Sequence, residues 1–203
     1  PSALQALLDE VRGEKEERLI STMMLRSLQK ARYSHENVGH FGLASKYYCH
    51  FTSPIRRYPD LMIHRIIKED IHGKLNEKRI KELNEIIPKI AEQSSIRERA
   101  AEEAEREVED LKKAEYMAER IGEEYEGIIS SVTSFGFFVE LENTVEGLVH
   151  VSHMEDDFYI FDEVNHALIG ERKRKLYRIG DTVRVKVLSV DIANRSIDFV
   201  LVD

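Results

Sequence analysis

The apolar pattern of this sequence changes once, near Tyr125, and this change constrains the fold more than any other feature. Before it, apolar residues recur at the three- and four-residue spacing of helices. After it, they alternate with polar residues in short runs bounded by glycine. A chain with helices first and a sheet second belongs to the α+β class, so we predict two domains, residues 1–124 and 125–203.

Helices are predicted throughout the first part except in its aromatic-rich middle. The predicted ranges are 2–11, 14–32, 58–72, a helix from 77 that is bent or ended near Pro88, and a long charged helix over 91–124. Residues 33–57 are dense in glycine and aromatic residues, which predicts loop or short strand there.

Five strands are predicted in the second part, at 127–132, 136–141, 147–151, 182–190 and 196–202. The segment between the third and fourth strands lacks clear alternation, and we predict an irregular stretch with a helical interruption. Five short strands interrupted in this way indicate an OB-type barrel.

Charge is distributed unevenly along the chain. Thirty Lys and Arg residues face 38 Asp and Glu residues, for a net charge of −8, which excludes a wholly basic nucleic-acid wrapper. Residues 1–91 nevertheless carry +4, residues 92–126 carry −7 and residues 127–203 carry −5. A hydrophobic content of 42% excludes a disordered chain.

Cys49 is the single cysteine, so neither an intrachain disulfide nor a cysteine zinc cluster can form. The sequence has neither a signal pattern nor an apolar run of about 20 residues, so a cytoplasmic protein without a membrane partner is expected. The chain begins at Pro1 without an initiator methionine, which suggests a segment of something longer.

Two adjacent arginines, Arg56 and Arg57, precede the predicted helix at 58. The planar guanidinium group binds phosphate oxygens in a bidentate manner, so this pair is a candidate phosphate clamp. Taken alone, such a pair is more often a solvated surface or a salt-bridge partner.

The surrounding residues carry a specific resemblance. HFGLA over 40–44 and HFTSPIRRYPDL over 50–61 resemble the signature of the RNB-type exoribonucleases, the ribonuclease R and ribonuclease II family. The resemblance implies the mainly helical C-terminal part of the RNB catalytic domain. It implies that Arg56 stabilises charge at the scissile phosphate and that Arg57 holds a neighbouring phosphate. Glu105 matches a position in the RNA channel of the family, although most of the helix face over 97–110 is expected to be ordinary solvated surface.

Metal ligands are not expected in this chain. Two-metal phosphodiester hydrolysis needs several converging carboxylates, and the first 91 residues contain only Asp9, Asp60 and Asp70 as scattered aspartates. The family places its metal-binding aspartates upstream of the matched segment. We therefore expect Mg²⁺ to be the cofactor of the full-length enzyme and this chain alone to bind RNA without degrading it.

Two other groups of polar residues are weak metal candidates. His35, His40, Cys49 and His50 do not follow a standard zinc spacing, and hydrogen-bonded histidines are the expected alternative. The acidic residues over 156–163 are expected to be exposed loop acidity that attracts a divalent ion weakly at most.

The last 77 residues carry a second resemblance. The runs over 132–139 and 146–152 resemble the S-one RNA-binding domain, a five-stranded OB-fold module. It implies base stacking on Phe135 and Phe138, with Phe137 expected in the core. It also implies RNA-facing positions for the residues His150, Asp191 and Arg195.

A basic run over 172–175, followed by Arg178, would add sequence-independent phosphate attraction. Outside this context such a run is as often a solvated loop. Its place in an otherwise acidic part of the chain favours a directed role.

The favoured function is part of a processive 3′→5′ exoribonuclease that hydrolyses single-stranded RNA to nucleoside 5′-monophosphates. The alternatives are a non-catalytic RNA-binding adaptor and a helical protein-interaction module with an unrelated barrel. Single-stranded RNA is the expected partner, RNA-decay or ribosome-associated factors are further candidates, and no oligomer is implied.

Overall fold

The computed structural model describes residues 2–13 and 17–202. The chain divides into two compact units, one of residues 1–12 and 23–104 and the other of residues 13–22 and 105–203. Every described strand lies in the second unit. The α+β class is confirmed.

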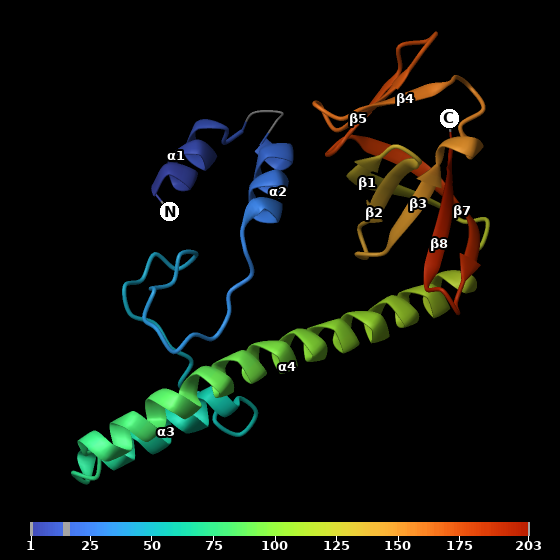
Figure 1. The fold of residues 1–203 in the computed structure, drawn as a ribbon. Coiled ribbons are helices and arrows are strands. Elements are labelled where there is room, and N and C mark those ends of the chain that lie inside the picture. The colour runs from blue at the N-terminus through green and yellow to red at the C-terminus, as the bar shows by residue number, and fades with distance from the viewer. Residues whose placement is uncertain (1, 14–16, 203) are drawn as a thin grey trace. The chain divides into compact units, whose positions relative to one another are not determined.

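Four helices come first along the chain (Figure 1). They are α1 (Ser2–Glu10), α2 (Glu17–Ser27), α3 (Tyr58–Ile71) and α4 (Glu77–Ala118). None of the helices described combines the length and the apolar character needed to cross a bilayer.

The prediction of a helix over 14–32 was wrong at its end, and residues 14–16 lie outside the described residues. Helix α2 ends at Ser27, and further along the chain the backbone N–H of Tyr33 is bonded to the hydroxyl of Ser95 on α4, at 3.0 Å. Lys30 also pairs with Glu102 of α4. Contacts with α4 replace helical hydrogen bonds here, and the chain stays irregular up to α3, as predicted.

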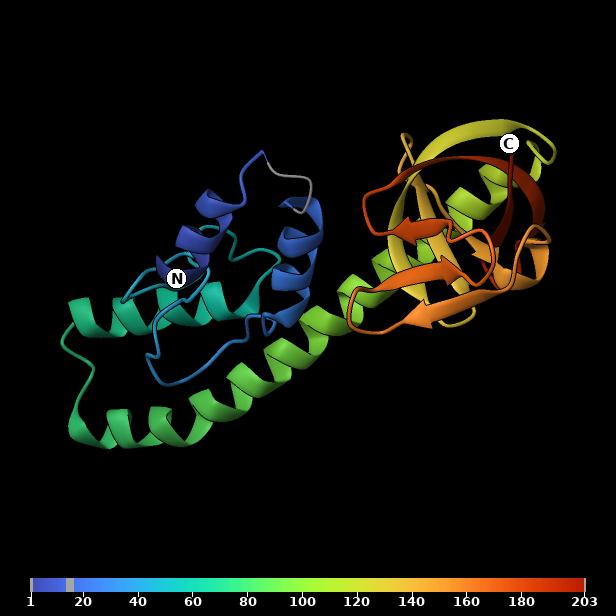
Figure 2. The ribbon, with the colours of Figure 1, turned by 90° about the horizontal axis from the view of Figure 1, so that it is seen from above.

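Two helices were predicted over 77–124, and this was wrong: α4 is a single helix through Pro88. A proline removes one intrahelical hydrogen bond, but its φ angle fits a helix, so the remaining bonds can carry the helix past it. Figure 2 shows α3 and the first part of α4 running in opposite directions on either side of a short loop. Arg79 closes this loop by donating from Nε and Nη2 to the Glu69 carboxylate, at 2.8 and 2.9 Å.

Five strands close into a barrel in the order β1-β2-β3-β8-β7, so the predicted OB-type barrel is confirmed. The strands are β1 (Glu124–Thr133), β2 (Gly136–Leu141), β3 (Glu146–His150), β7 (Thr182–Asp191) and β8 (Ser196–Leu201). Strands β3 and β8 pair in parallel, and the other four pairs are antiparallel.

The segment between β3 and β7 is more regular than predicted. After a single 3-10 turn over Val151–His153 it forms a separate antiparallel sheet. The strands of this sheet are β4 (Tyr159–Asp162), β5 (Ala167–Gly170) and β6 (Leu176–Arg178). Strands of three or four residues are too short for alternation to be recognisable, which explains the wrong prediction.

The barrel core is filled from the strands and from the end of α4. Phe137 and Phe199 are completely buried, as is Met117 of α4. The core position expected for Phe137 is confirmed. Gly147 leaves room for the Phe199 ring, because a Cβ at this position would lie 2.5 Å from Cε2 of that ring.

We predict that Gly147→Ala destabilises the barrel by about 1–3 kcal/mol, the usual cost of overpacking a core. Gly42→Ala is the matched control, since its Cβ would make only ordinary contacts, at 3.7 Å from the His40 ring. Urea denaturation monitored by circular dichroism measures both variants. Equal stability of the two variants would contradict the packing described.

Candidate nucleic-acid interface

A tight turn before α3 sets the positions of Arg56 and Arg57. The carbonyl oxygen of Ser53 accepts the backbone N–H groups of Arg56 at 3.2 Å and of Arg57 at 2.9 Å. Arg57 is the extended residue that precedes α3, and Pro59 lies in the first turn, where a missing N–H costs no helical hydrogen bond. The arginines thus lie immediately before a helix, as the sequence predicts.

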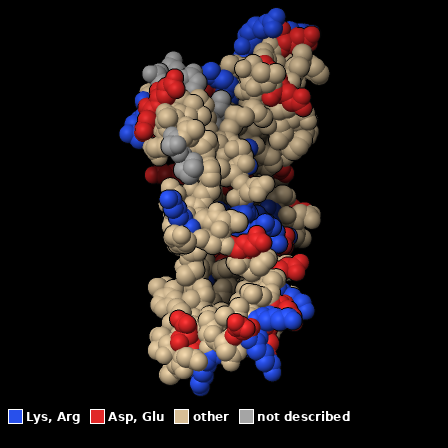
Figure 3. All heavy atoms as spheres, turned by 60° about the vertical axis from the view of Figure 1, so that its left-hand side comes forward, with Lys and Arg blue, Asp and Glu red and all other residues tan. Residues whose placement is uncertain are grey.

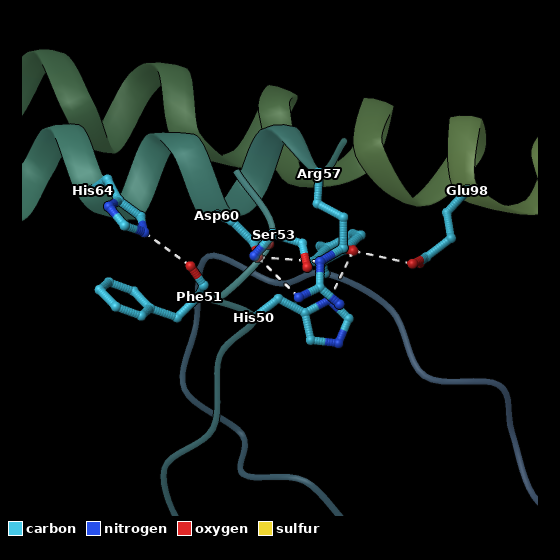
Figure 4. A network of polar contacts seen from close by, with 8 residues as sticks. His50, Phe51, Ser53, Arg57, Asp60, His64 and Glu98 are labelled. Atoms are coloured by element: carbon cyan, nitrogen blue, oxygen red, sulfur yellow. Dashed lines mark hydrogen bonds and ion pairs between the residues drawn. The ribbon is translucent and has the colours of Figure 1, made fainter. Parts of the chain in front are cut away.

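Asp60 of α3 is hydrogen-bonded to both Ser53 and Arg57 of this turn, as Figure 4 shows. Its carboxylate is completely buried, and its Oδ2 accepts the Ser53 backbone N–H at 2.8 Å. The same oxygen accepts Nε and Nη2 of Arg57 at 3.1 and 2.9 Å. Burial raises the pKa of Asp60, but the hydrogen bonds from Ser53 and Arg57 outweigh it and leave the pKa below the ordinary value.

The two arginines have different surroundings. The side chain of Arg57 is 22% exposed and is engaged with Asp60. The side chain of Arg56 is exposed and makes no hydrogen bond or ion pair with any residue that the structure describes. Of the two, Arg56 is the one whose charge is available to a ligand.

A second polar group lies beside the turn and is centred on Tyr33. The hydroxyl of Tyr33 donates to Oε1 of Glu98 at 3.0 Å and lies 3.0 Å from Nδ1 of His50. Burial, followed by the Glu98 carboxylate, raises the pKa of Tyr33 to about 12. Tyr33 therefore stays protonated at neutral pH. Its hydroxyl links His50, in the segment before the turn of Arg56 and Arg57, to Glu98 of α4.

A cavity of about 680 Å³ opens beside this group. Its polar edge includes Tyr33, His50 and Glu98, and its apolar lining comes from α3 and α4. The apolar lining includes Met62, Ile63, Ile66, Ile87 and Ile90.

Within residues 2–13 and 17–202, no three His, Cys, Asp or Glu side chains converge to hold a metal ion. The described residues thus include no group of three such side chains that would hold Mg²⁺ by itself. His50, considered above as a zinc candidate, is instead hydrogen-bonded to Tyr33.

The predicted stacking residues of the barrel are brought together. Phe135 is 45% exposed, its ring contacts that of Phe138 edge-on, and it lies nearly parallel to the His150 ring. Gly136 brings this turn against β3, since a Cβ at this position would lie 2.2 Å from the Val149 carbonyl oxygen. The result is an aromatic surface of the kind on which successive bases stack. We call Phe135, Phe138 and His150 the aromatic face.

Arg195 lies at a groove of about 510 Å³ that Phe138 also lines, together with the end of α4. It pairs with Glu107 at 3.3 Å. The other charged residues of the groove are mainly acidic and are Asp110, Lys113, Glu140, Glu146 and Asp198. Repulsion by these carboxylates would direct a phosphate backbone away from the groove floor.

Asp191 and Glu105 are two further residues predicted to face RNA, and neither belongs to the aromatic face. The carboxylate of Asp191 accepts the backbone N–H and the side-chain amide of Asn194, and these bonds lower its pKa. It therefore shapes the turn between β7 and β8. Glu105 is an exposed residue of α4.

The predicted basic loop lies between β5 and β6 and is organised by Asp157. The Asp157 carboxylate accepts backbone N–H groups of Phe158, Arg172 and Lys173, at 2.6 to 3.1 Å. Lys173 also pairs with Asp156 at 3.6 Å. The charge of the loop is thus partly compensated within the second unit.

Figure 3 shows basic and acidic side chains interspersed with larger uncharged areas on the parts of the surface that it draws.

Comparison with known proteins assigns both parts of the chain. Residues 2–73 match the RNB domain, and residues 119–201 match the S1 RNA binding domain, the S-one module expected from the sequence. The chain therefore combines an RNB segment with an S1 module, and the resemblance to the RNB exoribonucleases is confirmed.

The curated relatives are named ribonuclease R. Ribonuclease R 1 of Lactococcus lactis is 54% identical over 97% of this chain, and ribonuclease R of Thermotoga maritima is 45% identical over 100% of it. The chain spans 24% and 29% of the lengths of these relatives. A solved structure of Mycoplasma genitalium RNase R, in complex with ribose methylated single-stranded RNA, matches 97% of this chain and 31% of its own chain, with a TM-score of 0.87 and 32% identity.

Sequence reasoning did not identify Asp60 as part of the arginine site, and it did not connect Tyr33 with Glu98. The spacing from Arg57 to Asp60 across a helix start was a usable signal, because residues three apart in a helix are neighbours. The contact between Tyr33 and Glu98 spans 65 positions, and local spacing cannot reveal it.

We predict that the basic loop opens as the pH falls below the ordinary aspartate value of 3.8. Burial raises the pKa of Asp157, but the backbone hydrogen bonds outweigh it and lower the pKa. The stabilisation is therefore present above 3.8 and is lost as the pH falls through the lower folded value. A loss of hydrogen-exchange protection at the Arg172 and Lys173 amides, measured relative to the exchange rate of an unstructured peptide at the same pH, reports this opening.

Asp157→Asn should produce the same loss of protection already at neutral pH, whereas Glu155→Gln, a change at an exposed neighbour, should not. Unchanged protection of these amides in Asp157→Asn would show that the carboxylate does not organise the loop.

Proposed function

We propose that this chain is the RNA-gripping portion of a processive 3′→5′ exoribonuclease of the ribonuclease R type, acting on single-stranded RNA in the cytoplasm. The observation that carries the proposal is the exposed side chain of Arg56, which has no hydrogen-bond or ion-pair partner among the described residues and lies on a turn fixed by hydrogen bonds to the buried Asp60. The aromatic face supports it independently, because exposed rings on an OB barrel suit unpaired bases. We also propose residues 1–124 and 125–203 as the two domains.

Each residue would have a defined task. The Arg56 guanidinium group would bind the oxygens of the scissile phosphate and stabilise the charge that develops on them. The aromatic face would hold incoming bases by stacking, and Arg195 would contact the strand at the edge of the groove. Asp191 would act by shaping the neighbouring turn, and Glu105 would border the path of the RNA.

Mg²⁺ would supply charge neutralisation and an activated water in the full-length enzyme. Its ligands would come from residues outside this chain, because the carboxylates described here do not converge. The product would be nucleoside 5′-monophosphates. The resemblance assigns Arg57 a phosphate contact as well, but its ion pair with Asp60 favours another role.

We predict that this chain binds 5′-labelled single-stranded RNA but leaves its length unchanged in the presence of Mg²⁺. Binding is measured by fluorescence anisotropy and length by denaturing gel electrophoresis. Progressive shortening of the RNA would show that the chain holds a complete metal site.

We predict that Phe135→Ala combined with Phe138→Ala weakens RNA binding by about 1–3 kcal/mol for each base whose stacking is lost. Phe158→Ala is the matched control, because Phe158 is 67% exposed and directly precedes β4 but does not belong to the aromatic face. Anisotropy titration with the same RNA measures both. An equal loss in the control would indicate a nonspecific effect of removing exposed rings.

A further inference from the structure

We propose that Arg57 does not contact RNA and instead acts, together with Asp60, as a strut that holds Arg56 in its outward position. The inference rests on the proposed function, because it assigns the RNA contact of this loop to Arg56 alone. Arg57 and Asp60 are positioning residues in this account.

One oxygen atom makes the strut possible. Oδ2 of Asp60 accepts the Ser53 backbone N–H and both Nε and Nη2 of Arg57. Ser53 begins the turn, Arg57 ends it, and Asp60 belongs to the first turn of α3. A single buried carboxylate therefore ties both ends of the turn to the helix (Figure 4). Arg56 lies between these ends in the chain, and its backbone N–H is bonded to the Ser53 carbonyl oxygen.

Burial makes this ion pair costly to exchange for a phosphate contact. Asp60 is completely buried, and its other oxygen, Oδ1, has no hydrogen-bond partner among the described residues. Turning Arg57 toward a phosphate would leave a buried carboxylate with its charge uncompensated, which is strongly unfavourable. Keeping Arg57 on Asp60 avoids this cost.

The two arginines also differ in whether a neighbouring carboxylate balances their charge. The charge of Arg57 is balanced by Asp60 before any RNA arrives, so it would displace few counterions from RNA. The charge of Arg56 is not balanced by a contact with any described residue. Only a side chain that neutralises a phosphate contributes to the salt dependence of RNA binding.

The first test measures the affinity of this chain for a labelled single-stranded oligouridylate over a series of potassium chloride concentrations. Arg56→Gln should make the slope of log affinity against log salt shallower by about 0.7, the value for one phosphate on a single strand. Arg57→Gln should weaken binding but reduce that slope less than Arg56→Gln does, because the charge of Arg56 is still present. Thermal melting of each variant shows whether the first unit is still folded.

Asp60→Asn is the decisive variant, since it still allows a hydrogen bond but removes the negative charge. If Arg57 were an RNA ligand, freeing it from Asp60 would tighten binding. The strut predicts weaker binding, because the turn that presents Arg56 is loosened. Arg57→Lys keeps the charge but cannot make both hydrogen bonds that Nε and Nη2 of Arg57 donate to Asp60. It should therefore weaken RNA binding as Arg57→Gln does.

The outcomes separate the two claims. Three results would overturn the strut. They are tighter RNA binding by Asp60→Asn, full RNA affinity of Arg57→Lys, and a salt slope reduced equally by Arg57→Gln and Arg56→Gln. Each of them would leave the proposed RNA contact of the loop intact. An unchanged slope in Arg56→Gln would overturn the proposed RNA contact, and the strut with it.

Discussion

The candidate RNA site of the first unit depends on the hydrogen bonds that the buried carboxylate of Asp60 accepts from Ser53 and Arg57. This carboxylate accepts hydrogen bonds from the start and the end of one turn and fixes both to the first turn of α3. Without it, the Ser53 N–H and the Arg57 guanidinium group would lose a common partner. A charged group without solvent access is tolerated only where it is paired and hydrogen-bonded, so this sequence can bury Asp60 only while Arg57 remains beside it.

The second unit meets a different constraint, the closure of a five-stranded barrel around two phenylalanine rings. Phe137 and Phe199 fill the core, Gly147 leaves room for the Phe199 ring, and Gly136 allows the backbone to approach the Val149 carbonyl oxygen of β3 closely. Closure also leaves Phe135 at a turn where its ring stays exposed. The same strand arrangement thus buries one set of aromatic residues and leaves at the surface the ring for which we propose base stacking.

Local pattern predicted most of the elements, and contacts between distant residues account for the differences. The periodicity around α3 and the alternation in the five barrel strands were sufficient, because each element is long enough to show its period. Helix α2 is shorter than its pattern, and the segment after it contacts α4 through the bond from the Tyr33 N–H to Ser95, two residues 62 positions apart in the chain. The sequence motif identified Arg56 and Arg57 as a pair, but only the structure distinguishes the exposed arginine from the one engaged with Asp60.

The central claim is that RNA contacts this chain at two places, the Arg56 turn and the aromatic face. Photochemical cross-linking of the chain to single-stranded RNA containing halogenated uridine, followed by mass spectrometry of the cross-linked peptides, tests this claim most directly. The account predicts cross-links at Phe135 or Phe138 and within residues 50–57. Cross-links confined to the charged surface of α4, with none at these two places, would contradict it.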